Sequence, residues 1–445
     1  MNARTICIVG VCFALGAGTV SAQAQEPEQD YVSRQEHEAL KRDFEVLKTE
    51  LESIKQGESA QPAQEAGSSQ ESSWLELERT RLRLEALEEV TASLEYGESS
   101  FHVTGFAFTR FVDRERADST FTTVLAPVFL WEINDRLLFE SELELELKSE
   151  GGHGETEVEL EYAHASYLLN DYITLGAGKF LTPFGLFPER LHPAWINKLP
   201  DGPLAFAHGG IAPFASVGAY VRGGFPVGST KLNYAFYLSN GPALNTGEHE
   251  PDEAGMLAFE NFSDINNNKA VGGRIGFLPV PELEIGYSFL IGAVNPTGDE
   301  IGDADALIQG VDVSYVREVD FLAGMVDLRF EYVRSEVDTV TFDPGGSLGF
   351  GPLTFDNDRD GLYLQLAYRP TQTDLKFLRD VEFVGRYDHL DFPSGAPESA
   401  DTERWTFGIN YWLNPSSVLK FAYQITDIEG EEDQDAFLVM FAIGF

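Results

Sequence analysis

The alternation of apolar and polar positions is clearest at the end of the chain. In Phe437–Phe445 every second residue is large and apolar, while the residues between become smaller towards the end. A period of two predicts a β-strand, and nine residues are enough for a tilted strand to cross a bilayer. An apolar edge strand would promote aggregation in a soluble protein, but in a closed barrel it pairs with the first strand. The pattern therefore favours a membrane barrel over a soluble β-sandwich.

The same alternation recurs from Phe101 onwards and predicts sixteen strands, with fourteen or eighteen as alternatives. The predicted strands are 100–113, 120–133, 137–148, 156–169, 172–182, 215–225, 231–239, 269–278, 283–294, 306–316, 321–334, 360–368, 381–389, 403–412, 417–426 and 435–445. Short turns connect them on one side, and segments of up to about thirty residues connect them on the other. Both ends of an even-stranded barrel then lie on the short-turn side.

Several strands carry a row of large apolar residues opposite a polar or small row. The clearest rows are Leu283, Ile285, Tyr287, Phe289; Val326, Leu328, Phe330, Tyr332; Leu362, Leu364, Leu366, Tyr368; and Leu419, Phe421, Tyr423, Ile425. Small soluble barrels point such rows inward to fill a core. Sixteen strands enclose too wide a space for that, so we expect the apolar rows to face lipid and the polar rows to face a wet lumen.

The hairpin 137–162 has the sharpest charge pattern. Seven glutamates share one face, opposite leucines, Phe139, Val158 and Tyr162: Glu140, Glu142, Glu144, Glu146, Glu157, Glu159 and Glu161. With the leucines towards lipid, this face becomes an acidic stretch of the pore wall. The phase weakens at 163–166, where His164 would face lipid, so a β-bulge is possible there.

The same phase places basic residues on the lumen side of other strands. These are Arg222, Arg274, Arg329, Arg386 and Lys420, with Lys231, and they accompany Glu284, Asp312, Asp327, Glu331, Glu382 and Asp388. Arginines opposite an acidic wall would create a transverse field across the pore. Alternatively, these groups form ordinary ion pairs and select nothing.

The segment that begins at the end of the fifth strand, 178–214, is unusually apolar for a surface loop, being rich in Phe, Leu and Pro. A loop of this composition should be buried. Folding into the barrel would bury it and narrow the pore, with Lys179, Arg190, His192, Trp195 and Lys198 at the constriction. Packing at a subunit interface is the alternative.

The first hundred residues have a different organisation. Residues 1–22 resemble a secretory signal, with Arg4 before an apolar run and a small-residue cleavage site after Ala22 or Ala24. Residues 23–57 contain a heptad pattern that predicts a periplasmic coiled coil, 58–72 form a linker, and 73–97 predict a second amphipathic helix. The barrel then takes 98–445. The heptads need a partner, which is either other copies of the chain in a trimer or the mouth of the barrel.

Composition excludes several functions. Cys7 and Cys12 are lost with the signal, so no disulfide or thiolate chemistry remains. The remaining 30 basic and 73 acidic residues make nucleic-acid binding improbable. The histidines show no pair at metal-ligand spacing, and no catalytic constellation can be assembled. We therefore predict no enzyme activity, no cofactor and no metal.

Two stretches resemble a known family. Gly178-Lys-Phe-Leu-Thr-Pro-Phe-Gly185 and Ser239-Asn-Gly-Pro242 are similar to motifs of the phosphate-selective porin O and P family, which also has a signal peptide, an N-terminal coiled coil and a terminal Phe. The resemblance covers about 100–445 and implies a trimeric sixteen-stranded channel with an inward-folded loop. That family's phosphate channels use arginine and lysine ladders, whereas the clearest ladder here is glutamate. Phe445 resembles the sorting signal that the barrel-assembly machinery reads.

The sequence thus predicts an outer-membrane porin for passive diffusion of small hydrophilic solutes or ions. Its expected partners are outer-membrane lipid, lipopolysaccharide and two further copies of the chain, and its N-terminal helices are expected in the periplasm. An anion- or phosphate-selective porin, a structural tether acting through the coiled coil, and an outer-membrane hydrolase are the alternatives.

Overall fold

A computed structural model describes residues 99–445, except 151–152, 208, 249, 296–300, 398–399 and 431; the side chains of 149, 150 and 153 are also outside the description. The predicted signal peptide, coiled coil, linker and second helix therefore lie outside the described residues. Within the described part, no helix is both long and apolar enough to cross a membrane.

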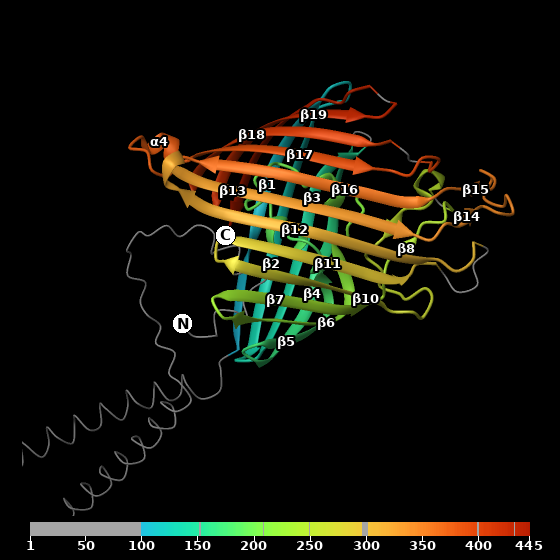
Figure 1. The fold of residues 1–445 in the computed structure, drawn as a ribbon. Coiled ribbons are helices and arrows are strands. Elements are labelled where there is room, and N and C mark those ends of the chain that lie inside the picture. The colour runs from blue at the N-terminus through green and yellow to red at the C-terminus, as the bar shows by residue number, and fades with distance from the viewer. Residues whose placement is uncertain are drawn as a thin grey trace, which may run out of the picture. The chain divides into compact units, whose positions relative to one another are not determined.

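The described chain forms one closed antiparallel barrel of sixteen strands (Figure 1). The strands are β1 (Ser100–Arg114), β2 (Thr120–Asn134), β3 (Leu137–Glu150), β4 (His153–Asn170), β5 (Ile173–Leu181), β6 (Ala215–Val227), β7 (Thr230–Ser239), β10 (Ala270–Val280), β11 (Leu283–Ala293), β12 (Asp305–Val319), β13 (Gly324–Val337), β16 (Asn357–Arg369), β17 (Val381–Asp391), β18 (Thr402–Asn414), β19 (Ser417–Ile428) and β20 (Ala436–Gly444). The predicted number of strands is confirmed. Pairing of β20 with β1, from Phe106↔Gly444 to Arg114↔Ala436, closes the barrel and leaves no free edge.

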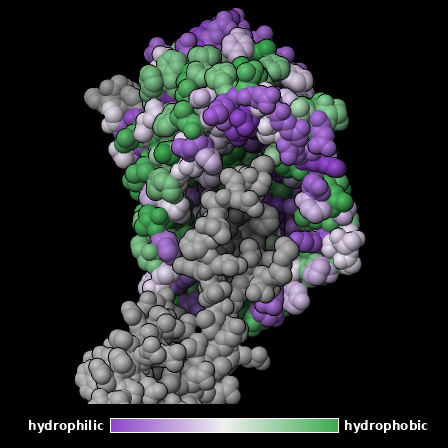
Figure 2. Space-filling model, turned by 90° about the vertical axis from the view of Figure 1, so that its left-hand side faces the viewer, coloured by the Kyte–Doolittle hydropathy of each residue, from purple (hydrophilic) through white to green (hydrophobic). Residues whose placement is uncertain are grey.

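The apolar rows face outward. On β20, Phe437 and Phe441 are each 42% exposed, whereas Leu438 and Met440 between them are buried at 3% and 2%. The same phase exposes Ile285 and Tyr287, Leu364 and Leu366, and Phe421, Tyr423 and Ile425. An apolar outer surface is suited to lipid hydrocarbon. Figure 2 shows green hydrophobic residues on the flank and purple hydrophilic residues around the opening at one end.

The two ends of the barrel differ. The short connections, and the α4 turn (Lys376–Arg379), lie at the end where Figure 1 marks the C-terminus. The long loops lie at the opposite end and include two small sheets that the sequence did not predict. These pair β8 (Ala243–Leu244) with β9 (Leu257–Ala258), and β14 (Thr341–Phe342) with β15 (Leu353–Thr354). A buried cluster that includes Leu244, Val294, Val337, Phe342 and Phe355 holds these loops together.

One orientation predicted from the sequence is wrong. The pairing of β3 with β4 shifts register between Glu142 and Leu143, because Glu142 pairs with Tyr162 while Leu143 pairs with Leu160. Glu161 is the extra residue of a β-bulge, slightly earlier than expected. Beyond the bulge the faces exchange, so Tyr162 is 5% exposed and His164 is also turned inward, rather than towards lipid.

Gly178 permits close pairing of β4 with β5. Its φ is +138°, in the region that favours glycine, and a Cβ there would lie 2.2 Å from the carbonyl oxygen of Ala163. Gly385 of β17 is a matched position, because it has no such φ and a Cβ there would meet nothing within 4 Å.

We predict that Gly178→Ala destabilises the barrel, by at least about 1–2 kcal/mol from backbone strain, with the steric clash adding to this. Gly385→Ala should be nearly neutral. The measurement is the denaturant concentration at the midpoint of unfolding in detergent. Heat-modifiable gel mobility reports the folded fraction. Equal midpoints for the two variants would contradict the argument.

Candidate functional site

The segment between β5 and β6, residues 182–214, folds into the barrel; we call it the lumen loop. Its Phe184, Phe187, Phe206 and Ile211 are buried in one cluster with side chains from the strands. The strand residues of that cluster are Phe180, Tyr220, Tyr237, Ala270, Leu290, Ile308, Val333, Tyr363 and Leu390. Burying these aromatics inside the barrel accounts for the apolar composition of the loop without a subunit interface.

Backbone donors near the start of the lumen loop bind the strand wall. Gly185 N–H donates to Ser288 Oγ at 3.0 Å, and Leu186 N–H donates to Glu331 Oε2 at 2.7 Å. The other oxygen of Glu331 accepts from Tyr363 at 2.5 Å. Gly185 has φ +64°, and a Cβ there would meet the Glu331 carboxylate, so only glycine fits this contact.

Asp201 anchors the middle of the loop through charge. Its carboxylate lies 3.1 Å from Arg386, 2.9 Å from Arg404 and 2.7 Å from the Gln424 amide. Burial by itself would raise the pKa of Asp201, but the Arg404 and Arg386 guanidinium groups outweigh it and hold the pKa below its ordinary value. Asp201 therefore stays ionised at neutral pH.

Two lysines hold the part of the lumen loop just before Asp201. Lys198 lies 2.7 Å from Glu382, and although burial lowers the pKa of Lys198, the Glu382 carboxylate raises it above its ordinary value. Lys420 of β19 is fully buried and donates to the loop carbonyls of Ala194, at 2.6 Å, and Asn197. A buried ammonium needs acceptors, and the lumen loop supplies them.

The other inward arginines predicted from the sequence are also paired. Arg222 contacts Glu189 of the loop, and Arg274 lies 2.6 Å from Asp312 and 2.9 Å from Glu284. Arg329 lies 2.6 Å from Asp327. Arg190, predicted at the constriction, lies 2.7 Å from Glu284. This geometry matches the ion-pair alternative, because these cations hold the lumen loop and the wall in place.

The glutamate face occupies another part of the wall. In the β3–β4 register Glu144 pairs directly with Glu159, and Glu146 with Glu157. The side chains of Glu157 and Glu159 are 50% and 49% exposed. Lys148 contacts Glu157, and Lys179 lies 3.7 Å from Glu159. Like charges that face each other across a strand pair repel, so this arrangement costs stability.

Two basic residues beside this face differ from expectation. Lys179 is not on the lumen loop but at the end of β5, where its ammonium lies 2.5 Å from Glu260 of the β7–β10 connection. Arg110 of β1, which sequence reasoning missed, donates to the Pro200 carbonyl at 3.3 Å and is close enough to Glu144 to attract it. The sequence indicates Arg110 only through its position in β1, which alternates with the lipid-facing residues.

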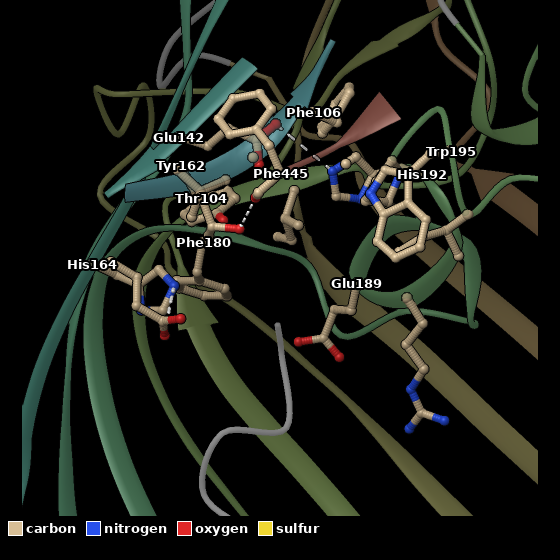
Figure 3. Close-up of a pocket in the computed structure, with 18 of the residues that line it drawn as sticks. Thr104, Phe106, Glu142, Tyr162, His164, Phe180, Glu189, His192, Trp195 and Phe445 are labelled. Carbon is tan, nitrogen blue, oxygen red and sulfur yellow. Dashed lines mark hydrogen bonds and ion pairs between the residues drawn. The ribbon is translucent and has the colours of Figure 1, made fainter. Parts of the chain in front are cut away.

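A cavity of about 300 Å³ lies between the lumen loop, the β3–β4 hairpin and the start of β1 (Figure 3). It contains Glu140 and Glu142 from the glutamate row, and His192 and Trp195 from the loop. It also contains aromatic and charged residues that the sequence did not single out as site residues: Phe106, Tyr162, His164, Phe180, Glu189 and Tyr220. The bulge explains part of this omission, because it turns Tyr162 and His164 into the cavity.

His192 sits against this cavity with little contact with water. Its Nδ1 lies 2.5 Å from the carbonyl oxygen of Pro188, and its Nε2 lies 4.0 Å from Glu142 Oε1. Burial lowers the pKa of His192 from 6.5 to about 4, and the Pro188 carbonyl offsets this only in part. At neutral pH the imidazole is therefore uncharged, and Nδ1–H donates to Pro188.

We predict a stability change between pH 6.5 and pH 4 that depends on His192. The unfolded chain protonates His192 near its ordinary pKa, whereas the folded chain resists protonation until about pH 4. The stability is therefore complete above pH 6.5 and falls as the pH decreases, by up to about 3 kcal/mol. Thermal midpoints of the wild type and His192→Gln, measured across this range, should converge at low pH. If the thermal midpoints of the two proteins change with pH in parallel, His192 is not the group responsible.

No protein-family model matches this sequence, and no curated protein matches it. Among solved structures, the chain is similar to OmpF of Salmonella typhi in its complex with daunomycin, with a TM-score of 0.52, 13% identity, and coverage of 78% of this chain and 98% of that one. An anion-selective porin from Comamonas acidovorans gives a TM-score of 0.47 and 12% identity, over 78% of this chain and 100% of that one. At this identity the likeness to OmpF establishes the fold alone: the described chain forms a barrel of the kind found in outer-membrane porins.

Proposed function

We propose that this protein is an outer-membrane porin through which small hydrophilic solutes diffuse passively, with a preference for cations. The observation that carries the proposal is the combination of a closed sixteen-stranded barrel, apolar outside, with a loop anchored within its lumen. The fold shared with OmpF supports this function. In the proposed arrangement the lumen loop narrows the passage, and solutes cross between the loop and the β3–β4 wall.

The distribution of charge supports cation preference over phosphate selectivity. Arg222, Arg274, Arg329, Arg386 and Lys420 each have a carboxylate or carbonyl partner. The cations of the lumen loop, Arg190 and Lys198, are also paired. Glu157 and Glu159 also have lysine neighbours, but their side chains are half exposed and face glutamates across the strand pair. The residues most available to a passing ion are therefore acidic.

The preference should be modest. Screening reduces the field of an exposed charge over about 8 Å at physiological salt and about 3 Å at 1 M. In a wide passage, ions farther than this distance from the glutamates are hardly affected by their charge. Lys148, Lys179 and Arg110 also neutralise part of the acidic face. We expect selectivity that is clear in dilute salt and fades in molar salt.

The first functional prediction concerns the facing pair Glu144 and Glu159. Changing both to glutamine should move the reversal potential in a potassium chloride gradient towards zero, because two lumen charges are removed. The matched control is Glu403→Gln with Asp427→Asn, a facing pair on β18 and β19 in the outward phase. The control should keep the wild-type reversal potential. If both double variants shift the reversal potential equally, or if the lumen pair does not shift it, the glutamates do not determine the ion selectivity.

A separate prediction concerns the lumen loop. Asp201→Ala removes the partner of Arg386 and Arg404, so the loop should loosen and the single-channel conductance should rise or fluctuate. Asp374→Ala removes the same charge from an exposed turn between β16 and β17 and should leave conductance unchanged. A quiet, wild-type conductance for Asp201→Ala would mean that the loop does not limit the passage.

We propose that the assembled form is a homotrimer in the outer membrane, in contact with lipid and lipopolysaccharide and with its N-terminal helices in the periplasm. The heptad pattern of 23–57 supports this assembly. The signal-like residues 1–22 and the terminal Phe445 support export and recognition by the barrel-assembly machinery. Chemical crosslinking of the full chain in detergent measures the number of copies.

A further inference from the structure

The cavity beside His192 has hydrogen-bond acceptors that no protein donor satisfies. Glu142 is only 2% exposed, and its Oε1 has no hydrogen-bond partner. Its carboxylate accepts from the Tyr162 hydroxyl, which faces it across the strand pair. Leaving a buried carboxylate oxygen without a donor costs free energy, so this atom indicates that a donor from outside the described chain binds here.

The atom opposite Glu142 does not supply the missing donor. His192 Nε2, at 4.0 Å, is itself buried without a hydrogen-bond partner. Because Nδ1–H donates to Pro188, Nε2 of the neutral ring carries no hydrogen and is an acceptor. Two acceptors thus face each other across a gap in which a shared donor can reach both (Figure 3).

Two carboxyl groups, those of Glu140 and Glu142, lie beside the gap. Glu140, the next inward residue of β3, lies 4.0 Å from His164 Nε2. The two arginines that border the cavity have other carboxylate partners: Arg222 pairs with Glu189, which also lines the cavity, and Arg190 pairs with Glu284. Among the lining residues, the carboxylates of Glu140 and Glu142 have no lysine or arginine within ion-pair distance.

The rest of the cavity is apolar and aromatic. Phe106, Phe180, Trp195 and Tyr220 line it, and Phe180 and Tyr220 pack edge to face with ring centroids 4.9 Å apart. A volume of about 300 Å³ is at the lower end of the range for small-molecule sites. Aromatic faces also attract a cation, which adds to the carboxylate charge.

We propose that this cavity is a binding site for a small organic ammonium ion with an aromatic or alkyl body. An ammonium group has three N–H donors and no acceptor, so it matches the two unpartnered acceptors, Glu142 Oε1 and His192 Nε2. It donates to Glu142 Oε1 and His192 Nε2 and faces Glu140, while its body lies against the aromatic side chains. Anions are excluded by the two carboxylates, and a neutral apolar molecule leaves Glu142 unsatisfied.

The site is separate from the proposed selectivity of the pore. Binding depends on Glu142 and the cavity, whereas cation preference depends on Glu144, Glu146, Glu157 and Glu159. A binding measurement in detergent requires no ion conduction. Failure of this proposal therefore leaves the porin proposal intact, and the reverse also holds.

The test titrates the full-length protein in detergent with the probe phenethylamine at pH 7.5. Binding is measured by titration calorimetry and by intrinsic tryptophan fluorescence, to which Trp195 contributes. The neutral analogue phenethyl alcohol has nearly the same shape. We expect saturable binding of the amine and at least about tenfold weaker binding of the alcohol, because the charged hydrogen bonds are lost. Glu142→Gln should weaken amine binding by a similar factor. The matched control, Glu146→Gln on the same strand face, should bind as the wild type does.

Three outcomes would overturn the proposal. Equal affinity for amine and alcohol would make the cavity merely apolar. Unchanged amine binding by Glu142→Gln would place the amine elsewhere. No saturable binding would mean that water alone satisfies Glu142 and His192. Should Glu142→Gln fail to assemble, Glu140→Gln replaces it, and the comparison of amine with alcohol on the wild type decides the question without any variant.

Discussion

The structure depends on how a wide barrel accommodates a buried loop. Sixteen strands enclose more space than their own side chains can fill, so the lumen loop can lie inside. Once there, its carbonyl groups and charges leave bulk water and need partners. Lys420, Arg386 and Arg404 provide them, by binding Ala194, Asp201 and Gly202 of the loop. The inward cations are therefore primarily structural elements that hold the loop.

This use of the cations determines the electrostatics of the lumen. A lumen with free arginines opposite glutamates would have a strong transverse field, but here the arginines are neutralised where the loop is anchored. The facing glutamates of β3 and β4 remain partly exposed. Their repulsion is tolerated because solvent and salt screen it, and because Lys148 and Arg110 lie close by. The lumen is therefore acidic at β3 and β4 and neutralised where the loop is anchored, because the loop contacts only part of the wall.

The bulge at Glu161 separates the two acidic regions. Before it in β4, Glu157 and Glu159 face Glu146 and Glu144 at the glutamate face. After it, Tyr162 and His164 turn inward and meet Glu142 and Glu140 in the aromatic cavity. One extra residue in a strand therefore turns a uniform glutamate row into two sites with different surroundings. The glutamates before the bulge are partly exposed to solvent. The cavity after the bulge is enclosed by the lumen loop.

The sequence by itself determined the barrel, its sixteen strands and the faces of most of them, because alternation with a period of two is a local property that each strand displays independently. It also indicated that residues 178–214 are buried, from their apolar composition. Only the tertiary structure decided which charges are paired, since the strand residues Glu331, Arg386 and Lys420 lie more than a hundred residues from the loop atoms that they bind. The sequence indicated a bulge near 163–166, but not its position at Glu161 or the inward turn of Tyr162 and His164. A bulge is specified by pairing with the neighbouring strand, and the Glu142–His192 cavity exists only after the loop has folded against that strand.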